Sequence, residues 1–313
     1  MKMNIVERIN KLKREKNAII LAHNYQPEEI QRVADFTGDS LELCRMAEKT
    51  DADIVIFCGV DFMAETAKIL NKDKKVLIPE IKDTECPMAH QLSPEMLIEA
   101  KKRHPNAKVV IYINTLSKAK VLADGVCTSA NAHIVVNSFE EDEIIFGPDR
   151  NLGYYVEKST KKKIITVPKD GHCYVHKKFT VEDILKAKEK YPNAQVLVHP
   201  ECDPEVQEMA DYVYSTGGMV KHVLNSPEKE FIIGTEVDMI TRLKIELEKK
   251  REKKKLIPLR EDAICEPMKK ITLEKLERCL VEEKYEVVLD EEIIERAKRA
   301  IDYMLSIGRE RKK

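Results

Sequence analysis

The chain has 313 residues, of which 43% are hydrophobic and 35% charged, and its formal net charge is −1. Nucleic-acid-binding proteins usually carry an excess of positive charge, which this chain lacks, so we expect no nucleic-acid partner. We interpret the cationic run at 249–255 as a solvated surface. No apolar run approaches the roughly 18 residues of a membrane span, and the first residues lack the apolar segment of a signal peptide, which predicts a cytoplasmic protein without a membrane partner.

The first predicted element is a helix at residues 4–16, and from residue 17 onward one unit is repeated three times. Each copy starts with an Asn-Ala pair and an apolar run; the pairs begin at residues 17, 106 and 193, so the copies are offset by 89 and 87. An Ala-Asp pair, a glycine, a proline, a cysteine and a helix-start signal follow in the same order. These landmarks are Ala34, Ala123 and Ala210; Gly59, Gly147 and Gly234; Pro79, Pro168 and Pro258; Cys86, Cys173 and Cys265; and Ser93, Thr180 and Thr272.

Each copy predicts the order strand, helix, strand, helix, strand, cysteine loop, helix. The strands are short continuous runs rich in Val and Ile, which is typical of parallel strands buried on both faces. We therefore expect an α/β fold of three repeated three-layer α/β/α modules, with parallel sheets arranged in pseudo-threefold symmetry around a central site. The expected limits are 17–103, 104–190 and 191–285 for the modules, with the helix at 4–16 packed on the array and a C-terminal helix at 286–313.

Equivalent positions at the strand ends carry polar side chains in all three copies. Ligands of open α/β sheets bind at the carboxyl ends of the strands, so three modules around one axis would bring these positions into a single cavity. Each residue alone has an ordinary explanation, such as a turn histidine or a helix N-cap, and the shared register is what favours a site. The equivalents are His23, Tyr112 and His199; Tyr25, Asn114 and Glu201; Ser40, Ser129 and Thr216; and Cys86, Cys173 and Cys265. Cys202 falls outside this set, and we do not expect it to be a ligand.

The chain has eight cysteines and no CxxC pair, so any metal site is assembled from distant segments. Three cysteines at one axis leave open a tetrahedral zinc site, a [4Fe–4S] cluster with one free iron, or plain loop packing. Iron–sulfur clusters normally take four cysteines. Three cysteines therefore favour a cluster in which one iron has no protein ligand and acts as a Lewis acid. His172 and His176 flank Cys173, but Glu85 and Ile264 stand beside the other two cysteines, so we expect a supporting or surface role for both histidines.

An ordered set of motifs resembles the quinolinate synthase family. The motifs are AHNYQ, GDSLELC, YINT, CTSANA, GHCYVH, HPEC, STGGM and CEPMKK, between about residues 17 and 282. The resemblance implies the three-module fold, a [4Fe–4S] cluster on three cysteines with its fourth iron open to substrate, and a role in NAD biosynthesis. It implies a dehydrating condensation of iminosuccinate (iminoaspartate) with dihydroxyacetone phosphate to quinolinate, phosphate and two waters.

Matched motif by motif, the resemblance also implies a role for each residue. The cluster ligands are Cys86, Cys173 and Cys265, and the substrate contacts are His23, Ser40, Tyr112, Asn114, Ser129, His199, Glu201 and Thr216. We expect Tyr25 and Glu201, with His199, to do the catalytic proton work, and Tyr25 and Glu201 to face each other across neighbouring modules. The implied partners are the two small-molecule substrates, and a transient contact with an aspartate oxidase or dehydrogenase that supplies iminosuccinate is compatible with them. A cluster- or zinc-containing sensor and a hydro-lyase of another hydroxy acid stay open as alternatives.

Overall fold

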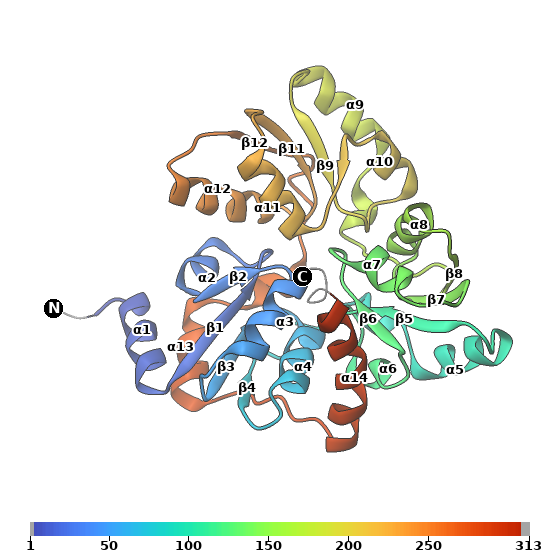
Figure 1. Ribbon diagram of the computed structural model, residues 1–313. Coiled ribbons are helices and arrows are strands. Elements are labelled where there is room, and N and C mark those ends of the chain that lie inside the picture. The colour runs from blue at the N-terminus through green and yellow to red at the C-terminus, as the bar shows by residue number, and fades with distance from the viewer. Residues whose placement is uncertain (1–2, 308–313) are drawn as a thin grey trace.

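The computed structural model describes residues 3–307, which form three four-stranded parallel sheets flanked by helices. The strand orders are β2-β1-β3-β4, β6-β5-β7-β8 and β10-β9-β11-β12, so the same topology occurs three times. Figure 1 shows the modules, coloured blue, green and yellow to orange, arranged around a common centre. The predicted fold class is confirmed. Within the described residues, no helix has both the length and the apolar character needed to cross a bilayer.

The bounds of the elements repeat from module to module. Module 1 contains β1 (Ala18–His23), α2 (Glu28–Val33), β2 (Phe36–Gly38), α3 (Ser40–Lys49), β3 (Ile54–Cys58), α4 (Asp61–Leu70) and β4 (Lys75–Leu77), then the 3-10 turn η1 (Ala89–Gln91) and α5 (Pro94–Arg103). Module 2 contains β5 (Lys108–Tyr112), α6 (Ser117–Lys120), β6 (Gly125–Cys127), α7 (Ala132–Asn137), β7 (Glu143–Gly147), α8 (Arg150–Ser159) and β8 (Lys163–Thr166), then η2 (His176–Lys178) and α9 (Val181–Lys190). Module 3 contains β9 (Gln195–Val198), α10 (Pro204–Met209), β10 (Tyr212–Val213), α11 (Thr216–Asn225), β11 (Glu230–Gly234), α12 (Met239–Lys250) and β12 (Lys255–Pro258), then η3 (Glu266–Lys270) and α13 (Leu273–Glu282). Two helices flank the array, α1 (Ile5–Glu15) and α14 (Glu291–Ile307).

Each sheet has one strand more than the sequence predicts. The extra strands β2, β6 and β10 are only two or three residues long, too short to show a periodic pattern. The repeated Ala-Asp pair explains why they form, because each aspartate leads into the short strand and its carboxylate accepts a hydrogen bond from a backbone N–H of the neighbouring strand. These bonds join Asp35 to Ile20, Asp124 to Val109 and Asp211 to Val196, each at 2.8 Å.

The last helix of each sequence unit packs against the next module. Helix α5 lies against α6 and β7 of module 2, α9 lies against α10 of module 3, and α13 returns to α1 beside module 1. Leu276 and Leu280 of α13 share a core with Ile20 and Ile56, so the return closes the ring of modules by apolar burial. The expected module limits stay a prediction, because these helices belong to one unit in sequence and to the next in packing.

Helix α14 joins modules 1 and 2. It lies against α4 of module 1 and against α6 and β6 of module 2, and its buried face includes Ile301, Met304 and Leu305. Residues 286–290 precede it, and Glu286 forms an isolated antiparallel bridge with Leu77. Residues 308–313 of the expected C-terminal helix lie outside the described residues.

Candidate functional site

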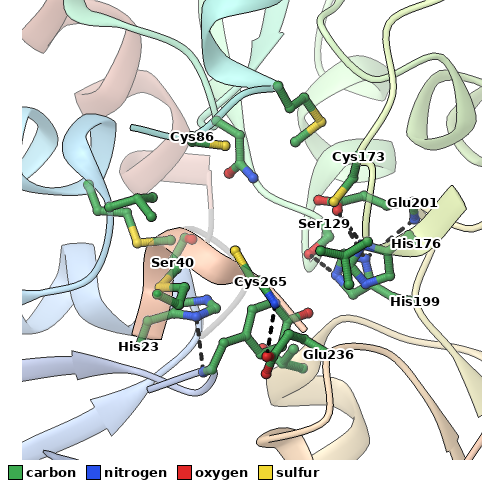
Figure 2. A pocket seen from close by; sticks show the side chains of 18 of the residues that line it. His23, Ser40, Cys86, Ser129, Cys173, His176, His199, Glu201, Glu236 and Cys265 are labelled. Atoms are coloured by element: carbon green, nitrogen blue, oxygen red, sulfur yellow. Dashed lines mark hydrogen bonds and ion pairs between the residues drawn. The ribbon is translucent and has the colours of Figure 1, made fainter. Parts of the chain in front are cut away.

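A central pocket gathers every residue that the repeat predicts for the site. The space inside the pocket, counted together with its opening to solvent, is about 610 Å³. The pocket is lined by Cys86, Cys173 and Cys265 and by His23, Tyr25, Ser40, Tyr112, Asn114, Ser129, His199, Glu201 and Thr216. Figure 2 shows that these side chains come from all three modules. The assembly follows from the topology, because the carboxyl ends of all three sheets face the common centre.

The three cysteines stand at equivalent places, in the loops that follow β4, β8 and β12, and each precedes a 3-10 turn. Burial raises the pKa of all three thiols, that of Cys265 to about 12. A backbone N–H three residues further on, from Ala89, His176 or Met268, hydrogen-bonds each sulfur and opposes this rise in pKa. The thiols would therefore ionise only next to a cationic group such as a metal centre.

The spacing of the donors indicates which side chains could bind a single metal ion. Within residues 3–307, one group of side chains offers ligand atoms that all lie within 4.8 Å of one another, and it consists of Cys173, His176 and Glu201. The sulfurs around one zinc ion lie within about 4.6 Å of one another, because each Zn–S bond is about 2.3 Å long. Cys86, Cys173 and Cys265 do not form such a group within these residues, so as the side chains stand here the compact donor set is the Cys173, His176 and Glu201 group.

The two helix-start hydroxyls at the pocket do not cap their helices. The N-cap of α3 is Asp39 and that of α11 is Ser215, each one residue before the predicted site residue. Ser40 and Thr216 therefore occupy the first helical position, and their hydroxyls line the pocket. Ser129 lies before α7, and its Oγ is 3.2 Å from His199 Nε2.

Tyr25 and Glu201 are linked through other side chains and make no direct hydrogen bond with each other among the described residues. Tyr25 Oη lies 2.6 Å from Thr235 Oγ1, which lies 2.8 Å from His176 Nε2. His176 Nδ1 lies 2.8 Å from Glu201 Oε2, and Tyr112 donates its hydroxyl hydrogen to Glu201 Oε1 at 2.6 Å. A chain of polar contacts therefore runs from Tyr25 through Thr235 and His176 to Glu201 and on to Tyr112, with members from all three modules. The His176–Glu201 contact has the distance of an ion pair, and His176 Nδ1 does not meet the geometry of a hydrogen bond.

For His176 the structure favours the supporting role over the surface role that the sequence also left open. Its side chain is 1% exposed, it lines the pocket, and its ring stacks on that of His199 at 4.7 Å between centroids. A surface role is therefore wrong for His176. His172 does have a supporting role, because its Nδ1 lies 2.8 Å from the Asp170 carbonyl and its backbone N–H donates to Gln91 Oε1.

The protonation states of the pocket follow from burial and from this chain of contacts. Burial lowers the pKa of His23 and of His199 to about 3, so both rings are neutral at pH 7 in the ligand-free protein. Burial alone would raise the pKa of Glu201, but the neighbouring imidazoles and the Tyr112 hydroxyl hold it below its usual value, so Glu201 is ionised. Burial and the Glu201 charge raise the pKa of Tyr25 and of Tyr112, which keeps both phenols protonated.

Some pocket groups lie outside the predicted set. Glu236 stands two residues after the repeated glycine at the end of β11, and Asp39 lies between the starts of α3 and α11. Thr235 does not line the pocket itself, but it contacts Tyr25 and His176, which do. The helix starts approach closely: a Cβ at Gly217 would lie 2.4 Å from Asp39 Oδ2. An acidic residue two positions after each repeated glycine is a sequence signal that could have identified Glu236, whereas Thr235 has no chemical counterpart in the other copies.

A family model described as quinolinate synthetase A protein matches residues 7–306. The chain belongs to this family. It is 64% identical over 307 residues to the quinolinate synthase of Methanocaldococcus jannaschii, which covers 98% of this chain and 100% of the relative. The quinolinate synthases of Methanothermobacter thermautotrophicus (59% over 301 residues, 96% and 97% covered) and Pyrococcus abyssi (54% over 306 residues, 98% and 100% covered) are similarly related. The relatives in the quinolinate synthetase A family carry enzyme names, and the chain is an enzyme of that family.

Proposed function

We propose that this chain is a quinolinate synthase of NAD biosynthesis. It condenses iminosuccinate with dihydroxyacetone phosphate, and the products are quinolinate, inorganic phosphate and two waters. The observation that carries the proposal is the central pocket, where cysteines of three modules meet polar side chains from equivalent strand ends. The names of the related proteins support the same activity.

Cys86, Cys173 and Cys265 would hold a [4Fe–4S] cluster that leaves one iron without a protein thiolate. When bound, such a cluster supplies a Lewis acid with an open coordination position. Two features of the chain support this assignment. The three cysteines line one pocket, and each sulfur accepts a backbone N–H that would stabilise a thiolate.

The substrates bring carboxylates and a phosphate, so the pocket must hold anions. Helices α3 and α11 both start at the pocket, with Ser40 and Thr216 at their first positions. The first turns of helices present free N–H groups and the positive end of the helix dipole, which favour anionic groups. His23 and His199, neutral in the ligand-free protein, would donate or accept hydrogen bonds at the same ligand, and the buried Asn114 Oδ1, which has no partner in the described chain, can accept one.

Two dehydrations and the closure of the ring require proton transfers. Ionised Glu201 is the candidate base, and Tyr25, which stays protonated, is the candidate acid. Thr235 and His176 connect the two groups, so a proton taken up at Glu201 could return to Tyr25 Oη without passing through bulk water. His199, stacked on His176, would orient this chain from the module 3 side.

The chemistry of the first substrate implies its source. An imine is two electrons more oxidised than the amine of aspartate, so an oxidase or a dehydrogenase that acts on aspartate must supply iminosuccinate. We place such an enzyme among the partners of this chain, in the cytoplasm.

The first test is the content of iron and acid-labile sulfide per chain, with Mössbauer or EPR spectra, on protein purified without oxygen. We expect four irons per chain, an iron signal that shifts when quinolinate is added, and formation of quinolinate from the two substrates. Stoichiometric zinc without iron, or turnover of another hydroxy acid with no quinolinate, would contradict the proposal.

Cysteine variants supply the matched control. Cys86→Ser should lose both iron and activity, because it removes one of the three thiolates at the pocket. Cys202→Ala should keep both, because Cys202 is fully buried in the core of module 3, with its thiol directed at the Gly234 carbonyl at 3.7 Å. Iron retained in Cys86→Ser would remove this residue from the ligand set.

A further inference from the structure

Two of the candidate cysteine ligands are held through their backbone by a carboxylate of the same module. The Cys86 N–H donates to Asp61 Oδ1 at 3.0 Å, and the Cys265 N–H donates to Glu236 Oε1 at 3.1 Å. Both carboxylates stand two residues after the repeated glycine, at the carboxyl end of β3 or β11, and Asp149 has the same place after β7. The three acidic residues therefore belong to the repeat, although their position has no part in forming the sheets.

A second hydrogen bond joins the same two loops in every module. It runs in the opposite direction: a backbone N–H at or just after the acidic residue donates to the carbonyl two residues before the cysteine. These bonds are Asp61 to Thr84 (3.2 Å), Arg150 to Gly171 (2.8 Å) and Val237 to Ala263 (2.9 Å). The backbone that leads into each cysteine is thus tied to the end of a buried strand, which is a rigid support for a ligand loop.

A basic residue four positions after the cysteine completes the arrangement in modules 1 and 3. His90 Nε2 lies 2.7 Å from Asp61 Oδ2, and Lys269 Nζ lies 2.7 Å from Glu236 Oε1. Lys269 also donates to the Tyr25 carbonyl at 2.6 Å. Each carboxylate thus has a basic side chain from the loop that it holds, and for the buried Glu236 the Lys269 ammonium supplies the compensation that a buried carboxylate needs.

Module 2 departs from this arrangement. Asp149 is fully buried, and its Oδ1 accepts the Leu152 N–H at 2.7 Å as the N-cap of α8. Asp149 Oδ2 has no hydrogen-bond partner within the part of the chain that is described. Lys177, the basic residue at the equivalent position, binds Asp203 Oδ2 at 2.5 Å instead. Module 2 thus keeps the acidic residue without its basic partner, and the Cys173 loop is tied to this segment by the Arg150–Gly171 backbone bond.

We propose that Asp61 and Glu236 are positioning residues for the metal centre: they fix the Cys86 and Cys265 loops and set the charge around these two ligands. The inference rests on the proposed function, because it assumes that the cysteines hold a cluster. It goes further in assigning a role to two acidic residues outside the set that the repeat predicts for the site. Groups that orient metal ligands affect metal binding by about 10–100-fold when they are removed.

Paired substitutions separate position from charge. Glu236→Ala and Asp61→Ala remove the acceptor, so we expect iron to be lost to a chelator at least about tenfold faster than from the wild type. Glu236→Gln and Asp61→Asn keep an acceptor oxygen and lose the charge. These amide variants should retain iron, with a cluster midpoint potential shifted to more positive values, because a negative charge that opposes reduction is gone. A purely structural role would leave that potential unchanged.

Asp238→Asn is the matched control, because Asp238 binds the same Lys269 at 2.5 Å and does not hold a cysteine amide. It should change the rate of iron loss and the potential less than Glu236→Gln does. If the wild type holds iron and all four variants match it in potential and in rate of iron loss, the inference is wrong and the proposed function stands. If the wild type itself holds no iron, the proposed function fails first. Should an alanine variant not fold, the amide variants decide the question alone.

Discussion

The Thr235 hydroxyl is the link on which the polar chain between Tyr25 and Glu201 depends. It lies 2.6 Å from Tyr25 Oη and 2.8 Å from His176 Nε2. Thr235→Val keeps the shape of the side chain and removes the hydroxyl. We therefore expect the rate of quinolinate formation to fall by about 10²-fold or more, which is the scale of general acid–base catalysis. Steady-state kinetics on iron-replete protein would measure this fall in kcat.

Thr235→Ser is the control, because it restores the hydroxyl and should stay within a few-fold of the wild-type rate. The valine variant should also lose about 1–3 kcal/mol of unfolding free energy, since the buried Tyr25 hydroxyl is left without its partner. Equal turnover in the valine variant and the wild type would mean that no proton passes through this hydroxyl.

Residues that occur in all three copies could be predicted from the sequence, and those that occur once could not. The register of the repeat identified the twelve site residues that line the pocket. His176 was missed because its equivalents, three residues after the other cysteines, are Ala89 and Met268. Thr235 was missed for the same reason, because Val60 and Pro148 occupy its place elsewhere. His176 and Thr235 each occur in one module only, so a comparison of the three repeats cannot identify them.

At the scale of the elements, one buried residue in each module holds the loop that follows the first strand. Gln31 Nε2 donates to the carbonyls of Asn24 (3.0 Å) and Gln26 (2.7 Å), and Gln207 Nε2 donates to those of Pro200 (2.9 Å) and Cys202 (2.8 Å). In module 2 the same register position is Lys120, which is fully buried and donates to the Thr115 carbonyl. These loops begin at the pocket residues His23, Tyr112 and His199. Lys120 therefore holds the loop of module 2 as the two glutamines hold the loops of modules 1 and 3.

Lys120→Gln should therefore preserve the fold and change how stability depends on pH. Burial lowers the pKa of Lys120 to about 8 from 10.5. Between these values the unfolded chain binds more protons than the folded one, so the free energy of unfolding of the wild type rises with pH in this window. Relative to Lys120→Gln, the rise should be on the order of 3 kcal/mol, and urea unfolding at a series of pH values would measure it.

Lys120→Met tests the other half of this prediction. Methionine fills the space without a donor and leaves the Thr115 carbonyl unpaired, so relative to Lys120→Gln it should cost about 1–3 kcal/mol at all pH values. A stability difference between wild type and Lys120→Gln that stays constant with pH would show that the lysine does not lose its proton in the folded chain.

The longer elements could be predicted from local chemistry, and the short ones could not. The helix caps Ser93, Thr180 and Thr272 are confirmed, because each side chain accepts a hydrogen bond from a backbone N–H of its helix. The edge strands β2, β6 and β10 depend on pairing with a neighbouring strand and on one aspartate bond each, which are tertiary interactions.

At the scale of the whole molecule, the ring of modules is closed by unequal cores. One apolar cluster runs through modules 1 and 2 and includes the buried face of α14. Module 3 instead has two clusters of its own, and α13 continues from it to module 1. We therefore expect modules 1 and 2 to unfold together and module 3 to depend more on the contacts at the central pocket. Cys86, Cys173 and Cys265 lie in three different loops at that point.

A cluster bound by these cysteines would act as a cross-link between the modules, and its removal should therefore weaken the whole fold. We expect chelation of the iron to lower the melting temperature by roughly 10 °C or more, because binding to the folded state alone adds to its stability. The apo-protein should unfold in two steps, with module 3 first, and the loaded protein in one. Calorimetry of both forms, with limited proteolysis near the first transition, would resolve the order.

Cys86→Ser, which lacks a ligand, should melt identically with and without chelator. If the loaded and apo forms of the wild type melt at one temperature, the three modules are held together by their protein contacts alone, and the metal centre has no part in joining them.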